Sequence, residues 1–360
     1  MFDIDSPDLL TSLALVPEQL CGYVKAVSGM RLRFCKGMAV YLYGDEAVLV
    51  GYPHAGALSA CVAEACEGGA ALPVDTIFNA EVLDAAVREV SAWDGLRKLT
   101  VLAPFRPAAA PAYAVSGQLA LFDHSNFKDV PPDTGSQLGM GGPSGQDGQP
   151  NPGKIGDCYY SLDLPFFRAD GEAPGQKLRN MLRRAGRELE IRRESTADGW
   201  QNGCSALVDE VLRTRVLPPG TRHIYGQIKS YLDNVPGAVL FTAREKSACA
   251  VGGCSCEGAE APGKLHGFCV GDFSALDTAF YMFAFRAADA VPGTADLLLA
   301  ALVEEAQKLG HCRVNLGLCI NGGIAFFKRK WGARAFLPYL ETTWELRPSG
   351  KGFFARLFGK

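Results

Sequence analysis

The chain has 360 residues, of which 48% are hydrophobic and 21% are charged, and its formal net charge is -3. This length exceeds what one hydrophobic core usually supports, so two domains are expected. The composition excludes general disorder, and the small negative charge excludes a nucleic-acid-binding field over the whole surface.

Targeting signals and disulfides are not expected. No apolar run approaches the roughly 18 to 20 residues needed to cross a bilayer. The first residues, Met1-Phe2-Asp3-Ile4-Asp5, are acidic, whereas a signal peptide begins with basic residues. The twelve cysteines are scattered within apolar segments, which is typical of reduced core residues. A cytoplasmic protein of bacterial type is expected.

The first third of the chain predicts a small α+β domain over residues 1–127. β-Branched and aromatic residues predict a strand hairpin, Leu32–Tyr43 and Ala47–Tyr52, that turns at Gly44-Asp45. The helices and the strand predicted after it are Ala57–Cys66, Asn79–Trp93 and Leu99–Pro104.

Residues 128–156 are rich in Gly, Pro, Ser, Asp and Gln and contain few large apolar side chains. This composition predicts a flexible linker. A second domain is predicted over residues 157–347, beginning with the strand Cys158–Leu164. Residues 348–360 form a tail of aromatic and basic residues. We expect the tail either to contact an anionic membrane surface or to pack on the domain.

A helix is predicted from Gln176 to about Ile191. Its apolar stripe consists of Leu178, Met181, Leu182, Ala185 and Leu189. Arg179, Arg183 and Arg187 form a neighbouring row at four-residue spacing. The row is interpreted either as a solvated face or as a contact for an anionic ligand or RNA.

Strands and helices alternate toward the C-terminus. The pattern predicts an antiparallel meander, a further strand, a helix, another strand, a short helix and a last strand. The predicted elements are Ala238–Ala243, Ala248–Gly253, Leu265–Val270, Phe280–Arg286, the helix Ala295–Leu309, Val314–Ile320, the short helix after Asn321, and Phe336–Leu346.

This order resembles the acyl-CoA N-acyltransferase (GNAT) fold, and in particular the Fem-type peptidyl transferases and the C-terminal domain of phosphatidylglycerol lysyltransferases. The resemblance rests on the basic helix Lys177–Ala185, the turn Pro292–Asp296, and Asn315-Leu316-Gly317 followed by Phe326–Ala333. It covers about the last 190 residues and implies an α+β fold with a mixed sheet flanked by helices. The smaller α+β N-terminal domain is interpreted as a reduced second copy of this fold.

The resemblance also implies a function. A transferase would move an acyl or aminoacyl group from a thioester or an aminoacyl-tRNA to a small-molecule or peptide amine. Acyl-coenzyme A is the expected cofactor, with tRNA as the alternative carrier, held at Pro292, Gly293 and Thr294 by the N–H groups of the following helix. The turn lacks an Arg/Gln-x-x-Gly-x-Gly/Ala signature, which leaves the donor open. The alternative is a non-catalytic module of the same fold that binds an anionic ligand or partner.

Acyl transfer to an amine needs a base, an acid and donors for the oxyanion, but no metal. Tyr339 and Glu341 share one face of the last predicted strand. Glu341 is the candidate base and Tyr339 the candidate acid, and the alternative is a solvent-facing side of the strand. Asn315 is the third catalytic candidate, because its side of the strand is expected to face the acyl group.

Other residues are candidates for binding. Asn321 either binds the cofactor or caps the following helix. Lys328, in the run Lys328-Arg329-Lys330, is a candidate phosphate contact, and a solvated surface is the alternative. The candidate substrate contacts are Tyr281, Gly317 and Arg183.

One group of residues has the chemical types of metal ligands: Cys249, Cys254, Cys256, His266 and Cys269. Its spacing matches no zinc motif. We therefore expect a packed set of reduced cysteines and no metal.

Overall fold

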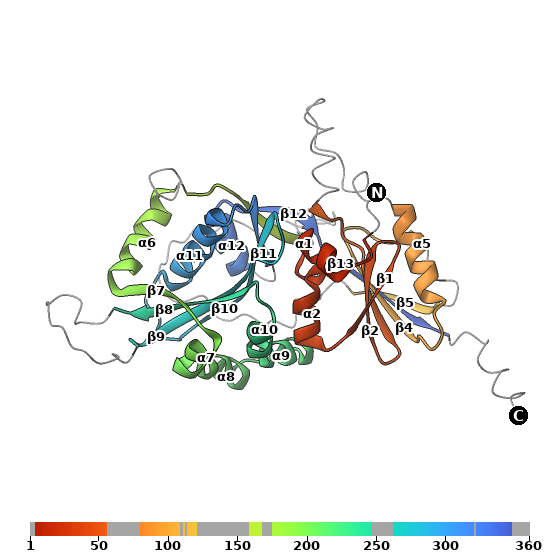
Figure 1. Cartoon of the computed structure of the whole chain (residues 1–360), viewed down its shortest axis with the longest axis horizontal. Helices are drawn as coiled ribbons and strands as arrows, with labels where there is room; N and C mark the ends of the chain where they lie inside the picture. Colours follow the sequence, from red (N-terminus) through yellow and green to blue (C-terminus); the bar gives the residue numbers. More distant parts are fainter. Residues whose placement is uncertain are drawn as a thin grey trace, which may run out of the picture.

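The computed structural model describes residues 4–55, 80–108, 111, 114–120, 158–167, 175–246, 262–319 and 322–347. Two sheets, each flanked by helices, form two lobes that lie side by side (Figure 1). Of the segments predicted from the sequence, the helix Ala57–Cys66, the linker 128–156, the strand Ala248–Gly253 and the tail 348–360 lie outside the described residues.

The first lobe is built on a six-stranded sheet with the order β1-β2-β3-β4-β13-β5. Neighbouring strands are antiparallel except for β3 and β4, which are parallel. The elements of this lobe are α1 (Pro7–Ser12), η1 (Pro17–Gln19), α2 (Cys21–Ser28), β1 (Arg31–Cys35), β2 (Met38–Tyr43), β3 (Glu46–Val50), α5 (Ala80–Ser91), β4 (Lys98–Ala103), β5 (Ala114–Ala120) and β13 (Leu340–Leu346).

The second lobe is built on a seven-stranded sheet with the order β12-β6-β11-β10-β9-β8-β7, in which only β10 and β11 run parallel. Its elements are β6 (Cys158–Asp163), α6 (Gln176–Glu188), β7 (Leu189–Glu194), α7 (Thr196–Gly199), η3 (Trp200–Cys204), α8 (Ser205–Thr214), α9 (Pro219–Gly226), α10 (Ile228–Asn234), β8 (Ala238–Glu245), β9 (Leu265–Asp272), β10 (Thr278–Arg286), α11 (Thr294–Lys308), β11 (Arg313–Leu318), α12 (Gly322–Lys330) and β12 (Arg334–Pro338).

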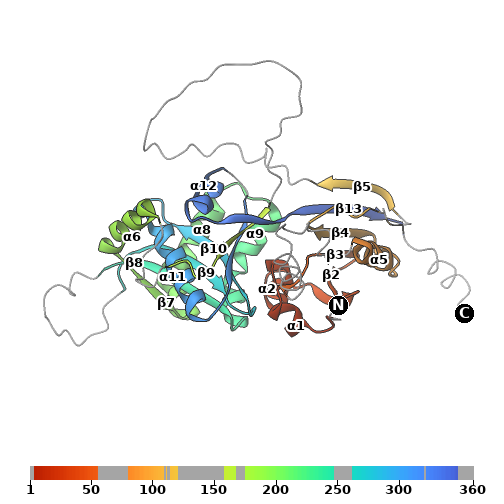
Figure 2. The same cartoon turned by 90° about the horizontal axis from the view of Figure 1, so that it is seen from above.

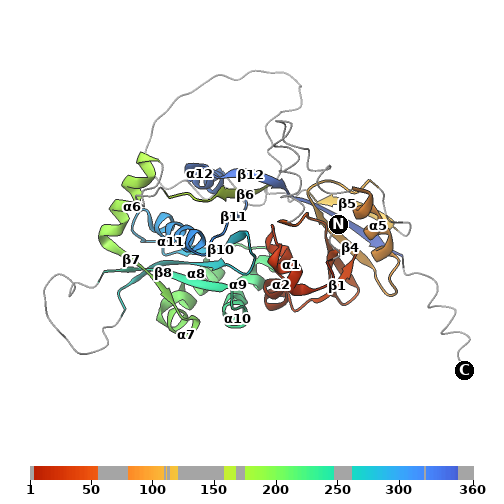
Figure 3. The same ribbon diagram turned by 45° about the horizontal axis from the view of Figure 1, so that its top comes forward.

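Helices cover both faces of the second sheet (Figures 1 and 3). α11 packs on one face, where Leu298, Leu299 and Leu302 join Phe241 and Cys269 in a continuous core. The helices α8 and α10 and the turn η3 cover the opposite face. The sheet is buried on both sides, which explains why its central strands are almost uniformly apolar.

The last strand joins the two lobes. β12 pairs with β6 in the second sheet, whereas β13 lies between β4 and β5 in the first sheet. Tyr339 alone separates the two strands, and Figure 2 shows the chain passing from the second lobe into β13 of the first. The predicted domain 157–347 therefore contributes its last strand to the first sheet.

Several predicted elements were wrong in detail. The single strand Leu32–Tyr43 is two strands, because Lys36 and Gly37 have positive φ and turn the chain between β1 and β2. The helix expected to reach Ile191 ends at Glu188, where the chain becomes β7 and pairs with β8. The predicted strand Phe336–Leu346 is broken at Tyr339. The sequence reading also missed the helices α7 to α10.

Because β13 is a central strand of the first sheet, its buried side chains are expected to stabilise the first lobe. Trp344 is 5% exposed and packs in the core formed by α5 and the first sheet. Trp344→Ala is expected to lower the free energy of unfolding by about 3–5 kcal/mol, measured by urea denaturation. Glu345→Ala, on the exposed side of the same strand, is the control. Equal, small effects of the two substitutions would contradict the prediction that β13 stabilises the first lobe.

Candidate functional site

The strands β10 and β11 separate partway along their length. They pair at Thr278–Phe280 with Arg313–Asn315, although β10 continues to Arg286 and β11 to Leu318. A register shift in β10 between Tyr281 and Phe283 and a positive φ of 75° at Gly317 accompany the separation. Beyond Phe280, no residue of β10 is paired with β11, and Tyr281, Met282, Phe283 and Ala284 line the opening.

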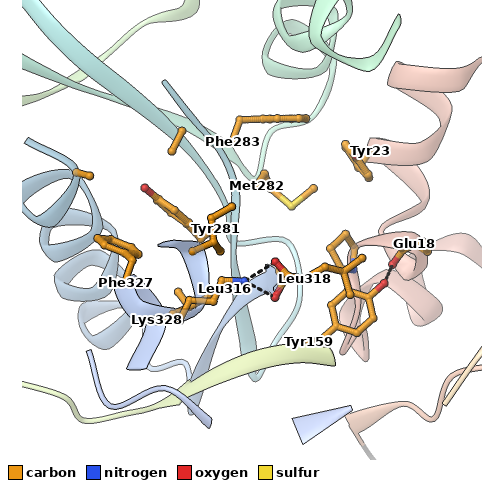
Figure 4. Close-up of a pocket in the computed structure, with 15 residues that line it drawn as sticks. Glu18, Tyr23, Tyr159, Tyr281, Met282, Phe283, Leu316, Leu318, Phe327 and Lys328 are labelled. Atoms are coloured by element: carbon orange, nitrogen blue, oxygen red, sulfur yellow. Dashed lines mark hydrogen bonds between the residues drawn. The ribbon is translucent and has the colours of Figure 1, made fainter. Parts of the chain in front are cut away.

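A cavity of about 460 Å³ lies at this opening. Figure 4 shows that its walls come from both lobes. The second lobe contributes the start of β6, parts of β10 and β11, the start of α11 and α12. The first lobe contributes η1 and α2. The lining residues used below are Glu18, Tyr23, Tyr159, Tyr281, Gly317 and Lys328.

Lys328 is a buried cation in the wall of the cavity. It is 4% exposed, and its Nζ donates hydrogen bonds of 2.7 Å to the carbonyls of Gly317 and Leu318. The ammonium also lies 5.5 Å from the ring centroid of Tyr160. Burial lowers the pKa of Lys328 to about 8. Lys328 therefore holds the separated end of β11, and it is not part of a solvated surface run.

Glu18 provides a carboxyl group on the first-lobe side. Tyr159 Oη donates a hydrogen bond of 2.8 Å to Glu18 Oε2. Burial raises the pKa of the Glu18 carboxyl above its usual value, and the hydrogen bond from Tyr159 opposes this only in part. Such a carboxylate accepts a proton more readily than one in water.

Two buried amides hold the loop that carries Glu18. The side chain of Gln19 accepts hydrogen bonds from the N–H groups of Leu15 and Val16 and donates to the carbonyls of Tyr52 and Pro53. Asn315 Nδ2 donates to the carbonyl of Leu15 at 2.7 Å, and Asn315 Oδ1 accepts from the N–H of Gly317 at the same distance. Asn315 thus holds the lining residue Gly317 and couples β11 to the first lobe.

The turn Pro292–Thr294 precedes α11, and the first turn of this helix reaches the cavity through Ala295. Gly293 has a φ of 95°, and Thr294 Oγ1 donates to the carbonyl of Val291 at 2.6 Å. Asp296 accepts hydrogen bonds from Trp331 Nε1 and Lys330 Nζ at 3.0 and 2.5 Å. The acidic side chain near this helix N-terminus is therefore paired with a cation.

The structure brings Tyr281, Gly317 and Lys328 together at the cavity, and Asn315 does not line it but accepts a hydrogen bond from the N–H of Gly317. Burial raises the pKa of the Tyr281 phenol, which stays neutral. Pro292, Gly293 and Thr294 lie beside the cavity but do not line it. Arg183 is exposed on α6 away from the lining residues, and Asn321 lies outside the described residues.

Glu341 and Tyr339 do not line the cavity. Glu341 lies in β13 between Leu102 and Ala120 of the first sheet, where burial raises its pKa. Tyr339 Oη donates to Glu341 Oε2 at 3.3 Å, and the Tyr339 ring packs against Tyr159 at a centroid distance of 5.9 Å. This pair is therefore separated from the cavity by Tyr159.

The sequence reading missed Glu18, Tyr23 and Tyr159. One signal for Glu18 was present, because a single acid stands between the apolar segments Leu13–Val16 and Leu20–Cys21. A glutamate between apolar segments is a signal, because this residue type is seldom buried without a partner. Tyr159 gave no comparable signal, since a strand tyrosine usually packs in a core.

Within the described residues, no group of three or more His, Cys, Asp or Glu side chains is placed to hold a metal ion. Of the cysteine-histidine group considered above, His266 bonds to Glu245 at 2.9 Å and Cys269 is fully buried. Cys249, Cys254 and Cys256 lie outside the described residues. No helix in the described part of the chain combines the length and apolar character needed to cross a bilayer.

No protein-family model matches the sequence, and no curated protein matches it. Among solved structures, FemX is 11% identical with a TM-score of 0.51, covering 98% of this chain and 97% of FemX. A conserved protein of unknown function from Bacteroides thetaiotaomicron is 10% identical with a TM-score of 0.50, covering 96% of this chain and 93% of that one. A tandem GNAT protein from the clavulanic acid biosynthesis pathway is 12% identical with a TM-score of 0.42, covering 92% and 88%.

The likeness to FemX is a likeness of fold and extends over both lobes. Two mixed sheets flanked by helices, with a parallel pair that separates beside a helix N-terminus, confirm the predicted GNAT-like α+β fold. The resemblance predicted for the last 190 residues or so thus extends over nearly the whole chain.

The position of Asn315 predicts a stability effect. Asn315→Leu leaves the carbonyl of Leu15 and the N–H of Gly317 without their partner in a buried place. The free energy of unfolding is expected to fall by about 1–3 kcal/mol in urea denaturation. Asn234→Ala removes a solvent-exposed amide and serves as the control. An unchanged midpoint for Asn315→Leu would contradict the bridging role.

Gly293 allows a second test, because α11 has a glycine with positive φ at each end. A Cβ at Gly293 would lie 3.0 Å from Ala185 Cβ and 3.1 Å from Met181 Cγ of α6, whereas a Cβ at Gly310 meets open space. Gly310→Ala is expected to cost about 1–2 kcal/mol from backbone strain alone. Gly293→Ala should cost more, as measured by thermal and urea unfolding. Equal costs would show that α6 does not pack tightly on the turn.

Proposed function

We propose that this protein is a transferase that moves an acyl or aminoacyl group onto an amine, and that the reaction takes place in the cavity between β10 and β11. The observation that supports this most is the pairing of a carboxyl group of raised pKa, Glu18, with an opening in the sheet that exposes main-chain groups of β10. These are the base and the oxyanion donors that aminolysis needs.

In the proposed reaction, Glu18 accepts a proton from the ammonium of the acceptor. The free amine attacks the carbonyl carbon of the donor, and N–H groups on the open edge of β10 stabilise the oxyanion. A carbon–nitrogen bond forms and the carbon–sulfur or carbon–oxygen bond to the donor breaks. The nitrogen loses two protons in all: Glu18 passes the first, taken from the ammonium, to solvent. It then takes the second from the nitrogen of the intermediate and donates it to the leaving sulfur or oxygen, so the base is regenerated.

The donor is proposed to be acyl-coenzyme A or aminoacyl-tRNA, which share a phosphate-bearing carrier. The turn Pro292–Thr294 and the first turn of α11 adjoin the cavity and present N–H groups with a positive helix end. The paired state of Asp296 lowers the repulsion that its charge would impose on a phosphate. A filled opening at Gly317 would have favoured a binding module without turnover, but Gly317 lines a cavity.

A titration of thermal stability tests the donor. A ligand that binds only the folded chain at 100 times its dissociation constant should stabilise it by about 2.7 kcal/mol. Stabilisation by coenzyme A and acetyl-coenzyme A would support a thioester donor. Stabilisation by aminoacyl-tRNA but not by the deacylated tRNA would support an aminoacyl-tRNA donor. No stabilisation by any of these would contradict the proposed function.

Glu18 predicts the pH dependence of transfer. Because the base must be deprotonated, kcat/KM should rise with pH through a pKa above that of an ordinary glutamate. Glu18→Gln should lower kcat/KM by about 100-fold or more and abolish the rise of kcat/KM with pH. Products would be detected by mass spectrometry with a panel of amines. Glu341 is the alternative base. If the rise of kcat/KM with pH were lost in Glu341→Gln and kept in Glu18→Gln, Glu341 and not Glu18 would be the base.

A further inference from the structure

The cavity carries two opposite charges at separate places. The carboxyl group of Glu18 is contributed by the first lobe, and the ammonium of Lys328 by α12 of the second lobe. Figure 4 shows them on opposite sides of the cavity, with Tyr159 and Leu318 between them. No ion pair joins the two groups among the contacts of the described residues, because each is held by other partners.

Neither charge is fully neutralised by its partners. Lys328 Nζ has three N–H groups, of which two reach the carbonyls of Gly317 and Leu318. Both acceptors are uncharged, so the positive charge has no anionic partner there. Glu18 accepts a hydrogen bond from the neutral phenol of Tyr159 at 2.8 Å. Lys328 is buried and Glu18 is half-buried. A charge that is withdrawn from water without a counter-charge is costly, and a ligand that supplies the counter-charge gains part of that energy on binding.

The space between the two charges is apolar. Met282, Phe283 and Leu316 line it, and the rings of Tyr23 and Tyr159 lie on the Glu18 side. Aromatic faces favour an ammonium group, and an apolar wall favours methylene groups. A volume of about 460 Å³ accommodates a small ligand.

We infer that the acceptor is an amine that carries an anionic group at the other end of a short apolar chain, with its ammonium at Glu18 and its anion at Lys328. An ω-amino acid is the simplest member of this class. The inference rests on the proposed function, since the amine at Glu18 is the one that attacks the donor. Lys328 is then a binding residue that decides specificity, and it does not react.

The test is calorimetric binding of a ligand series to the full chain without any donor. The series consists of glycine, 4-aminobutanoate and 6-aminohexanoate, with pentylamine and pentanoate as analogues that carry one charge each. At least one of the longer amino acids should bind about tenfold or more tightly than glycine and than either singly charged analogue, because a charged hydrogen bond is lost in each of these. Equal affinity of pentylamine, or no binding anywhere in the series, would overturn the inference.

Two variants assign the ends of the ligand. Lys328→Gln should remove the advantage of the amino acid over pentylamine, and Glu18→Gln its advantage over pentanoate. Lys308→Gln and Glu46→Gln alter exposed charges away from the cavity and should leave the order unchanged. Because binding is measured without turnover, discrimination without any transfer would refute the proposed reaction alone. Transfer to amines without this discrimination would refute the inference alone.

Discussion

The cavity depends on the side-chain amide of Asn315. At this point β11 leaves β10, and a strand that loses its neighbour also loses main-chain hydrogen bonds. The amide oxygen satisfies one of these groups by accepting from the N–H of Gly317, and the amide nitrogen donates to the carbonyl of Leu15 in the other lobe. Lys328 satisfies the next carbonyls of β11. The opening in the sheet is therefore stabilised by polar side chains from outside the strand pair.

The same interaction couples the two lobes. The loop before α2 carries Glu18, and it is tied to the second sheet by Asn315 and to its own lobe by Gln19. β13 provides the second link, because its insertion between β4 and β5 anchors the C-terminal strand in the first sheet. Aromatic contacts of Tyr159 with Tyr52 and Tyr339 fill the boundary between them. The acid and the cation of the cavity come from different lobes, so their separation depends on this docking.

Sequence patterns predicted elements well where a local period was strong. The helix α11 and the strands β9 to β11 appear close to their expected positions, because apolar periodicity and glycine stops decide them locally. The patterns failed where pairing partners decide. Phe336–Leu346 was predicted as one strand, although Pro338 lies within it. In the structure the chain leaves the second sheet at Pro338 and enters the first sheet at Leu340. Lys328 reads as part of a basic surface run, yet it is buried because two unpaired carbonyls lie within its reach.

By itself, the sequence predicted the α+β class and the order of elements from β9 to α12. It also named Tyr281, Gly317 and Lys328 as candidates, and the structure places these three at one cavity. These follow from side-chain period and residue chemistry, which act over a few residues. Only the tertiary structure decided that Glu18 and Tyr159 face Lys328 across one cavity and that Glu341 lies outside it. The physical reason is that these positions are set by contacts between residues about 140 to 300 apart in the chain, such as Tyr159 with Glu18 and Asn315 with Leu15, and such contacts leave no local pattern.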